Sequence, residues 1–428
     1  MRAFAPTLSM DFFAHPLPYL PDAAPYFAAL VDLPHAVWLD SAGRGRYDIL
    51  VAAPLRVLHF AQADADAFAA LRAALGDELP PLPDVPFAGG LLGYWGYDGD
   101  ATLGLYDWAV LVDHQQQQTR LVSRLRHPDT AAQLPAILAR LQNPPTLPAN
   151  TLRVHAAPQA NFTPASYAAA FARVQDYLHA GDCYQINLAQ RFSAPASGDA
   201  FGAYLHLRQL SPAPFSAYLN FPGLQVLCAS PERFLRVENG AVETKPIKGT
   251  RRRLPDPAAD AAQITDLCQH PKDRAENLMI VDLLRNDLSQ HCHSVRVPSL
   301  FAVESFAQVH HLVSTITGQL RPGRHALDVL RASFPGGSIT GAPKRRAMQI
   351  IAELEPHPRE LYCGSIAYLG WDGQMDSNIV IRTLLYRRGE ICAWAGGGLV
   401  ADSDCAAEYQ ETLDKAGAML TLLRAAQG

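Results

Sequence analysis

Two pairs of acidic residues are spaced so that their carboxylates can meet. Asp273 and Glu276 lie three residues apart, as do Glu408 and Glu411, and both pairs stand in segments with a helical pattern. Because residues i and i+3 share one face of a helix, each pair presents its carboxylates together. Two such helices facing a common space would form an oxygen site for Mg²⁺, which binds through a few carboxylates, waters and an anionic substrate. The alternative is that both pairs belong to solvated helix faces.

A lysine and a glutamate form a second candidate for chemistry. Lys248 stands between an isoleucine and a glycine in the segment Pro246–Thr250, and Glu232 precedes it in the segment Ser230–Phe234. Desolvation in an apolar stretch lowers the pKa of a lysine, which can then act as a nucleophile. A glutamate buried in the same way can hold a proton and act as a general acid. Taken singly, each residue is also consistent with a surface charge or a salt-bridge partner.

A glycine-rich loop is the third candidate. The segment Phe334–Lys344 contains Ser338, Thr340 and Gly341 and leads into a helical pattern. Such a loop offers free backbone N–H groups and the positive end of a helix dipole to an anion. It lacks the G-K-[ST] ending of a nucleotide-binding loop, so a carboxylate is the better ligand. The run Gly396–Gly398 would supply further donors, unless it is only a tight turn that needs positive φ.

The elements that must position these residues are predicted from hydrophobic periodicity and from helix start and stop signals. Helical patterns cover Ala65–Leu75, a segment that Thr163 caps and Gly181 ends, Pro271–Asp287, Pro343–Ala352 and Asp404–Arg424. Strand patterns cover Ala36–Leu39, Asp48–Ala52, Gly89–Tyr97, Trp108–Asp113, Gln185–Ala189, Gln225–Ala229, Phe234–Val237, Cys363–Tyr368, Asn378–Leu385 and Glu390–Ala395. Consecutive strands recur without a helix between each pair, which argues against a Rossmann sheet. We therefore expect an α+β fold with large, mostly antiparallel sheets that carry helices on their outer faces.

Composition limits the classes of partner. The chain has 428 residues, of which 49% are hydrophobic and 18% charged, as in a globular protein. No apolar run reaches the roughly 18 residues of a membrane span, so we expect a cytoplasmic protein without a membrane partner. A net charge of −5 argues against nucleic acid as a partner. The seven cysteines are scattered without a C-x-x-C pair, which predicts reduced thiols.

Taken in order, the motifs resemble those of the chorismate-utilising enzymes, most closely the component I group of the aminodeoxychorismate synthases. The resemblance rests on Gly181–Leu188, Ser230–Phe234, Pro246–Thr250, Glu276–Asp287, His311–Ser314, Pro335–Lys344, Asp376–Thr383 and Ala395–Thr412. It implies one large α/β/β/α sandwich of the anthranilate synthase component I type. In that fold residues 1–150 form an N-terminal subdomain and residues 160–425 the chorismate-binding part, intertwined in one body. The proline-rich stretch Pro144–Pro148 is the candidate boundary.

The resemblance also implies a role for individual residues. Glu276 and Glu411 would hold Mg²⁺, with Asp273 and Glu408 in support, and the metal would meet the ring carboxylate of chorismate. Arg382 and Tyr362 would bind the enolpyruvyl carboxylate, and His311 would position the ring and the departing hydroxyl. The remaining pocket would be lined by Gln185, Gly249, Thr250, Ser338, Thr340, Gly341, Gly397, Gly398 and Lys415.

Two positions distinguish the reactions of the family. Anthranilate synthases resemble this chain but have alanine in place of Lys248, and isochorismate synthases carry a lysine base in place of Gln185. The pair Lys248 and Gln185 therefore implies amination at C4, with Glu232 as general acid and Lys248 as nucleophile at C2. The product would be 4-amino-4-deoxychorismate, a precursor of para-aminobenzoate and folate. Anthranilate synthase component I and a non-catalytic chorismate- or tryptophan-binding subunit are the alternatives.

The source of ammonia is the last expectation. None of the seven cysteines lies in a G-x-C-x-G turn of the kind that activates a glutaminase thiolate. We therefore expect ammonia to come from a separate glutamine amidotransferase subunit.

Overall fold

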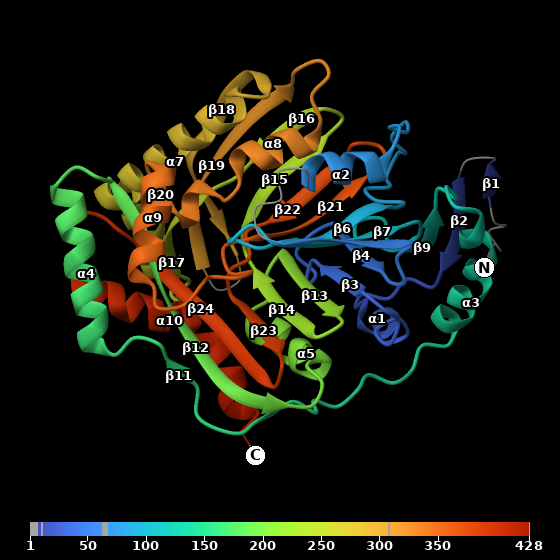
Figure 1. The fold of residues 1–428 in the computed structure, drawn as a ribbon, viewed down its shortest axis with the longest axis horizontal. Helices are drawn as coiled ribbons and strands as arrows, with labels where there is room; N and C mark the ends of the chain where they lie inside the picture. Colours follow the sequence, from blue (N-terminus) through green and yellow to red (C-terminus); the bar gives the residue numbers. More distant parts are fainter. Residues whose placement is uncertain (1–6, 10–11, 62–66, 307–308, 428) are drawn as a thin grey trace.

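The computed structural model describes residues 7–9, 12–61, 67–306 and 309–427, which build two large antiparallel sheets (Figure 1). Within these residues the first sheet has 14 strands and the second has 10. Helices lie against the outer faces of the sheets, so the predicted α+β fold with antiparallel sheets flanked by helices is confirmed. Among the described residues, no helix is both long enough and apolar enough to cross a bilayer.

The first sheet combines strands from the whole length of the chain. Its central path runs β4-β3-β13-β14-β23-β24-β12, so the late strands β23 and β24 lie between β14 and β12. In spatial order its strands are β1 (Thr7–Ser9), β2 (Phe12–Leu17), β9 (Gln118–Ser123), β8 (Ala109–Asp113), β4 (Tyr47–Val51), β3 (Ala36–Asp40), β13 (Phe215–Phe221), β14 (Leu224–Ser230), β23 (Thr383–Arg387), β24 (Glu390–Leu399), β12 (Gln185–Ser197) and β10 (Arg153–Val154), with β11 (Gln159–Ala160) and β20 (Gly341–Ala342) also on β12.

The second sheet likewise mixes early and late strands, since β6 pairs with β21. In order its strands are β17 (Ile247–Arg252), β19 (Val309–Leu320), β16 (Ala241–Thr244), β15 (Arg233–Glu238), β22 (Met375–Asn378), β21 (Ser365–Gly370), β6 (Gly90–Trp95), β7 (Ala101–Tyr106) and β5 (Arg56–Phe60), with β18 (Cys292–Ser305) also on β19. Strands from the first 150 residues thus pair directly with strands from the rest of the chain in both sheets.

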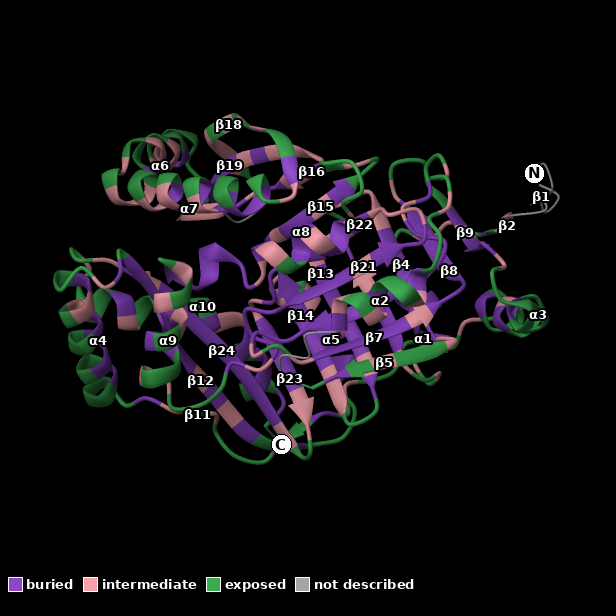
Figure 2. Ribbon diagram, turned by 45° about the horizontal axis from the view of Figure 1, so that its top comes forward, coloured by how far each residue is buried: buried purple, intermediate pink, exposed green. Residues whose placement is uncertain are grey.

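Helices lie against both sheets. They are α1 (Ala24–Ala28), α2 (Ala67–Leu75), α3 (Pro128–Gln142), α4 (Pro164–His179), α5 (Phe201–Leu210), α6 (Pro257–Gln269), α7 (Pro271–Ser289), α8 (Ala326–Ser333), α9 (Lys344–Leu354) and α10 (Cys405–Ala425). Figure 2 shows α6 and α7 with β18 and β19 on one side, and α4, α9 and α10 with β12 and β24 on the other. The predicted cap of α4 is confirmed, because the Thr163 side chain accepts a hydrogen bond from the backbone of Ser166.

The hydrophobic core follows the two-residue period of the strands. Along β13, Ala217 and Leu219 belong to the core that both sheets share, whereas Tyr218 between them packs in the core beneath α1, α5 and α10. A third cluster joins α4 and α9 to β12 through Tyr167 and Ile350. Ile186 and Leu188 at the start of β12 belong to this third cluster.

Most predicted elements are found with small shifts at their ends. For the helix predicted over Ala65–Leu75, Ala65 and Asp66 lie outside the described residues, and α2 accounts for the remainder. The single strand predicted over Asn378–Leu385 is wrong, because the chain leaves β22 in the second sheet and enters β23 in the first. Arg382 lies in this crossing with a φ of 50°, a left-handed conformation that interrupts any strand.

Candidate active site

Ser338 joins the candidate general acid to the candidate nucleophile. Its hydroxyl donates to Glu232 Oε1 at 3.0 Å, and its carbonyl accepts from Lys248 Nζ at 2.9 Å. Ser338 lies in the glycine-rich loop, Glu232 just before β15 and Lys248 in β17. Three segments separated in sequence therefore bring the acid and the amine to the two ends of one residue.

Burial shifts the pKa values of both groups toward their neutral forms. Desolvation raises the pKa of Glu232 above its ordinary value, although Lys248 and the Ser338 hydroxyl act in the opposite direction. Desolvation likewise lowers the pKa of Lys248, against the attraction of Glu276 and Glu232. A protonated carboxylic acid and an unprotonated amine are the forms that acid and nucleophilic catalysis require.

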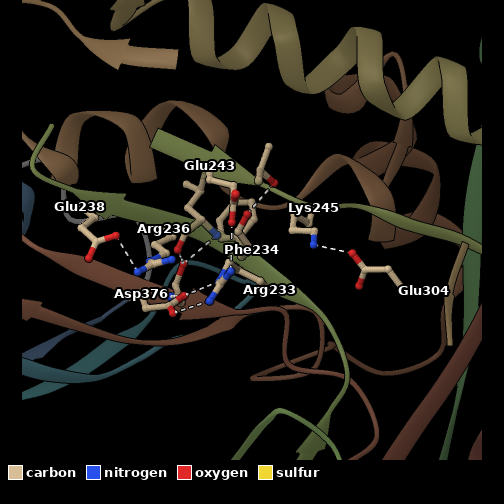
Figure 3. A network of polar contacts seen from close by, with 11 residues as sticks. Arg233, Phe234, Arg236, Glu238, Glu243, Lys245, Glu304 and Asp376 are labelled. Carbon is tan, nitrogen blue, oxygen red and sulfur yellow. Dashed lines mark hydrogen bonds and ion pairs between the residues drawn. The ribbon is translucent and has the colours of Figure 1, made fainter. Parts of the chain in front are cut away.

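Ion pairs fix the strands on which these two residues stand (Figure 3). Arg233, the residue after Glu232, makes two hydrogen bonds of 3.0 Å to Asp376 on β22 and one of 3.1 Å to Glu243 on β16. Lys245, just before β17, pairs with Glu304 on β18. A planar guanidinium on a carboxylate gives both distance and orientation, so the backbone beside Glu232 is held in register.

His311, Arg382 and Glu232 are close enough to influence one another electrostatically, since Arg382 acts on His311 and Glu232 acts on Arg382. The Nδ1 atom of His311 is 2.9 Å from the Thr250 hydroxyl, which stands opposite it in the β17–β19 register. Burial, with smaller contributions from Arg382 and His310, lowers the pKa of His311 to about 4, so its imidazole is neutral at pH 7. Burial also lowers the pKa of Arg382, and Glu232 partly restores it.

Gln185 is buried with a side chain that has no partner. It is 1% exposed, and among the described residues neither its Oε1 nor its Nε2 has a hydrogen-bond partner. Two glycines make room for it: a Cβ on Gly341 would stand 2.1 Å from the Gln185 carbonyl oxygen, and one on Gly398 would stand 2.1 Å from Nε2. An unpaired buried amide is costly, so this side chain is a candidate for binding a ligand.

The four acidic residues do not converge as a single group. Glu408 Oε2 and Glu411 Oε1 lie 3.1 and 3.5 Å from the place that a Cβ on Gly397 would take, so they face one point. Glu276 belongs to the same neighbourhood, because Lys272 Nζ lies 3.9 Å from its Oε1 and 2.9 Å from Glu408 Oε1.

Asp273 has different partners from the other three carboxylates. Its Oδ2 accepts from Arg251 at 3.0 Å and lies 3.2 Å from His270 Nδ1, while its side chain packs against the bare backbone of Gly249. Asp273 is thus bound by an arginine and lies beside a histidine. The i, i+3 spacing that linked it to Glu276 in the sequence does not make the two side chains act alike.

The remaining predicted residues take supporting positions. Lys415 Nζ pairs with Glu411 at 2.6 Å and donates to the Gly396 carbonyl at 2.9 Å. Burial raises the pKa of Glu411, but the charge of Lys415 outweighs burial, and the net effect is a lowered pKa. The Thr340 hydroxyl donates within its own turn to the Gly336 carbonyl. Tyr362 is buried and stacks on Trp394 with the ring centres 6.3 Å apart.

A magnesium ion fits this donor set only in part. Across the described ranges, no three His, Cys, Asp or Glu side chains form a preformed metal site. Mg²⁺ does not need one, since it binds proteins through one or two carboxylates and completes its shell with water and substrate oxygens. Glu276, Glu408 and Glu411 are the side chains in position to supply those carboxylates.

Comparison with known proteins decides the family. A family model for chorismate binding enzymes matches residues 39–421. The chain belongs to this family. It is 45% identical to aminodeoxychorismate synthase component 1 of Salmonella typhimurium, over 98% of this chain and 99% of that protein. It is 38% identical to anthranilate synthase component 1 of Streptomyces coelicolor, over 85% of this chain and 78% of that protein.

Solved structures agree with the fold of a chorismate binding enzyme. The crystal structure of anthranilate synthase component I from Streptococcus pneumoniae matches with a TM-score of 0.79 and 31% identity, over 88% of this chain and 92% of that one. The family resemblance inferred from the ordered motifs is confirmed by these matches.

Two further residues at the candidate site were not identified by the sequence analysis. Lys272, which lies between Glu276 and Glu408, stands four residues before Glu276, so helical spacing could have revealed it. Arg359 is 1% exposed and donates to the carbonyls of Ile339 and Asn187, which fixes the glycine-rich loop against β12. Its spacing of four residues from Glu355 predicts only their ion pair, and not the hydrogen bonds to the glycine-rich loop and β12.

A separate cavity of 690 Å³ lies elsewhere in this family member. Asp40, Ser41, Tyr47, Phe215 and Tyr368 are among the residues that line it. None of the residues predicted to act on substrate lines this cavity, so it is distinct from the candidate active site.

Proposed function

We propose that the protein is component 1 of an aminodeoxychorismate synthase, which converts chorismate and ammonia to 4-amino-4-deoxychorismate. The observation that carries the proposal is the placement of Glu232 and Lys248 on the two ends of Ser338. The 45% identity to a relative of that name over nearly the whole chain supports the same function.

The reaction begins with a displacement at the ring. Protonated Glu232 gives its proton to the 4-hydroxyl, which leaves as water, while the neutral amine of Lys248 adds at C2 and the two double bonds shift. Ammonia then adds at C4, the double bonds shift back, and Lys248 leaves as the amine. Ammonia loses one proton in this step, and Glu232, now ionised, is the group that can take it.

Arg382 and Tyr362 would hold the enolpyruvyl carboxylate, for which a guanidinium is suited by its planar pair of donors. Neutral His311, hydrogen bonded to Thr250, would orient the ring without adding charge. Glu276 and Glu411 would hold Mg²⁺, and Glu408 and Asp273 would support them. The bound metal would neutralise the ring carboxylate of a dianionic substrate beside these acidic groups.

Gln185 distinguishes ammonia from water as the nucleophile in this proposal. An amide cannot remove a proton from water, and ammonia needs no such base to attack. Both polar atoms of the Gln185 side chain are unpaired among the described residues, so they are available to a bound ligand.

The partner in the proposal is a glutamine amidotransferase subunit that supplies ammonia. We also place the protein in the cytoplasm, where its seven free thiols would remain reduced. The purified chain should form product with ammonium ions and fail with glutamine, and addition of an amidotransferase should restore use of glutamine. Product formation from glutamine by the chain alone would contradict the need for a partner.

The direct test is incubation of the purified protein with chorismate, Mg²⁺ and ammonium, followed by identification of the product by mass and chromatography. Aminodeoxychorismate is the expected product. Anthranilate as the main product would assign the protein to the other activity in the family, and binding of chorismate without turnover would make it a binding subunit.

A further inference from the structure

Lys272 is placed between carboxylates that belong to two different helices. Its Nζ donates to Glu408 Oε1 on α10 at 2.9 Å and lies 3.9 Å from Glu276 Oε1 on its own helix, α7. The Glu408 side chain is only 3% exposed, and the same Oε1 atom also accepts from the Ser403 hydroxyl at 2.6 Å. One ammonium thus links α7 to a buried carboxylate of α10.

The stability of α7 does not explain why a lysine stands here. Lys272 is the second residue of α7, where the positive end of the helix dipole disfavours a cation. The order Lys272 before Glu276 is also the weaker orientation for an i, i+4 ion pair. Both helix preferences disfavour a lysine at this position, yet its ammonium contacts two carboxylates of the candidate site. We therefore attribute its position to those carboxylates.

We propose that Lys272 is a built-in counter-cation that competes with Mg²⁺ for Glu276 and Glu408 and so weakens metal binding before chorismate arrives. The inference rests on the proposed function, in which these carboxylates meet a magnesium ion. An ammonium and a divalent cation repel strongly at ion-pair distances, so both cannot occupy the space between the two carboxylates. Chorismate adds a carboxylate of its own and shifts the balance toward the metal.

Neutral replacement of Lys272 tests this competition. Lys272→Met keeps the length of the side chain without its charge, and Lys272→Gln keeps a donor for Glu408, so the second variant serves if the first does not fold. Lys272→Arg keeps the charge. Arg285→Met is the matched control, because Arg285 lies on the same helix in an exposed pair with Asp282.

The measurement is calorimetric titration of each full-length, EDTA-treated protein with MgCl₂ in the absence of chorismate. We expect the neutral variants to bind Mg²⁺ about tenfold or more tightly than the wild type, because one repelling charge is gone. Lys272→Arg and Arg285→Met should bind as the wild type does. In thermal unfolding, the neutral variants should melt a few degrees lower in EDTA and recover in Mg²⁺, since buried Glu408 has lost its cation.

The outcomes separate this inference from the proposed function. Wild-type binding with no gain in the neutral variants overturns the role of Lys272 and leaves the proposed function intact. Binding by the neutral variants alone supports the competition. No binding by any variant overturns the inference, and turnover of chorismate with ammonium in EDTA then shows whether the synthase activity survives without the metal.

Discussion

Lys248 and Lys272 both interact with Glu276, yet their surroundings give the two ammonium groups opposite properties. Burial lowers the pKa of Lys248, whose nearest hydrogen-bond acceptor is the uncharged carbonyl of Ser338. Burial also acts against the charge of Lys272, but the bond to Glu408 outweighs it and raises the pKa of that lysine. A direct carboxylate partner thus favours the charged form of Lys272, whereas desolvation favours the neutral form of Lys248, which is the form that a nucleophile requires.

The largest expected effect comes from removing the lysine with the lowered pKa. Lys248→Ala should reduce kcat for amination with ammonium by about a thousandfold, because the nucleophile is lost. Steady-state kinetics and a chorismate binding titration measure the two quantities separately, and binding should change only a few fold.

The control for this variant is Arg236→Ala, which removes an exposed ion pair with Glu238 on β15 of the same sheet. It should keep wild-type activity. Near-normal amination by Lys248→Ala would show that the reaction does not pass through a Lys248 adduct. The different pKa values of the two lysines would then not matter for catalysis.

The carboxylates around Lys272 should respond to a change in metal concentration instead. Glu276→Gln and Glu411→Gln should each raise the Mg²⁺ concentration for half-maximal activity by about tenfold to a hundredfold, because glutamine keeps the volume but removes the charge. Asp273→Asn should have a smaller effect, since Asp273 is already bound by Arg251 and lies beside His270. Activity that is unchanged in EDTA would contradict a metal role for this cluster.

His311 adds a third basic side chain to the comparison. Its pKa of about 4 lies below the ordinary value of about 6.5, so the unfolded chain binds more protons than the folded one between these values. Folding stability should therefore fall as the pH drops through this window, by about 2 kcal/mol between pH 7 and pH 5.

In His311→Asn this component of the pH dependence should disappear, which urea unfolding at pH 7, 6 and 5 would measure as a flatter curve. Equal pH slopes for the two proteins would mean that His311 is not held neutral by its surroundings.

The smallest effect is expected at the residue that joins the acid to the amine. Ser338→Ala keeps the carbonyl that holds Lys248 but removes the hydroxyl that stabilises ionised Glu232. The pKa of Glu232 should rise further, so the alkaline limb of the kcat profile should move to higher pH, with a loss of less than about tenfold at the optimum. If the alkaline limb does not move, the group that titrates in this limb is not Glu232.

Sequence patterns predicted the parts of the site that depend on local spacing. The cap of α4 and the helical periods of α4, α7 and α10 were predicted correctly because a helix is specified by neighbours three and four residues away. The crossing at Arg382 was missed because an apolar, β-branched run continues through it, and only the two separate sheets decide where the strand breaks.

The sequence patterns also could not predict the long-range contacts within the site. Lys272 and Glu408 are far apart in the chain, and no local pattern in either helix predicts that they form an ion pair. The ordered motifs supplied the family and the roles that it implies, whereas the division of the acidic residues, with Asp273 bound to Arg251, depends on tertiary packing. Spacing alone treats Asp273 and Glu276 as equivalent.

The position of β23 and β24 between β14 and β12 has a consequence for how the protein is made. On the ribosome β12 and β14 emerge early, but the strands that cover their edges end only at Leu399. Until then a nascent chain carries two unpaired strand edges, which are templates for association with other chains. Ribosomes stalled before residue 383 should therefore hold an aggregation-prone chain that recruits holding chaperones, and release from them should coincide with synthesis of the last two strands.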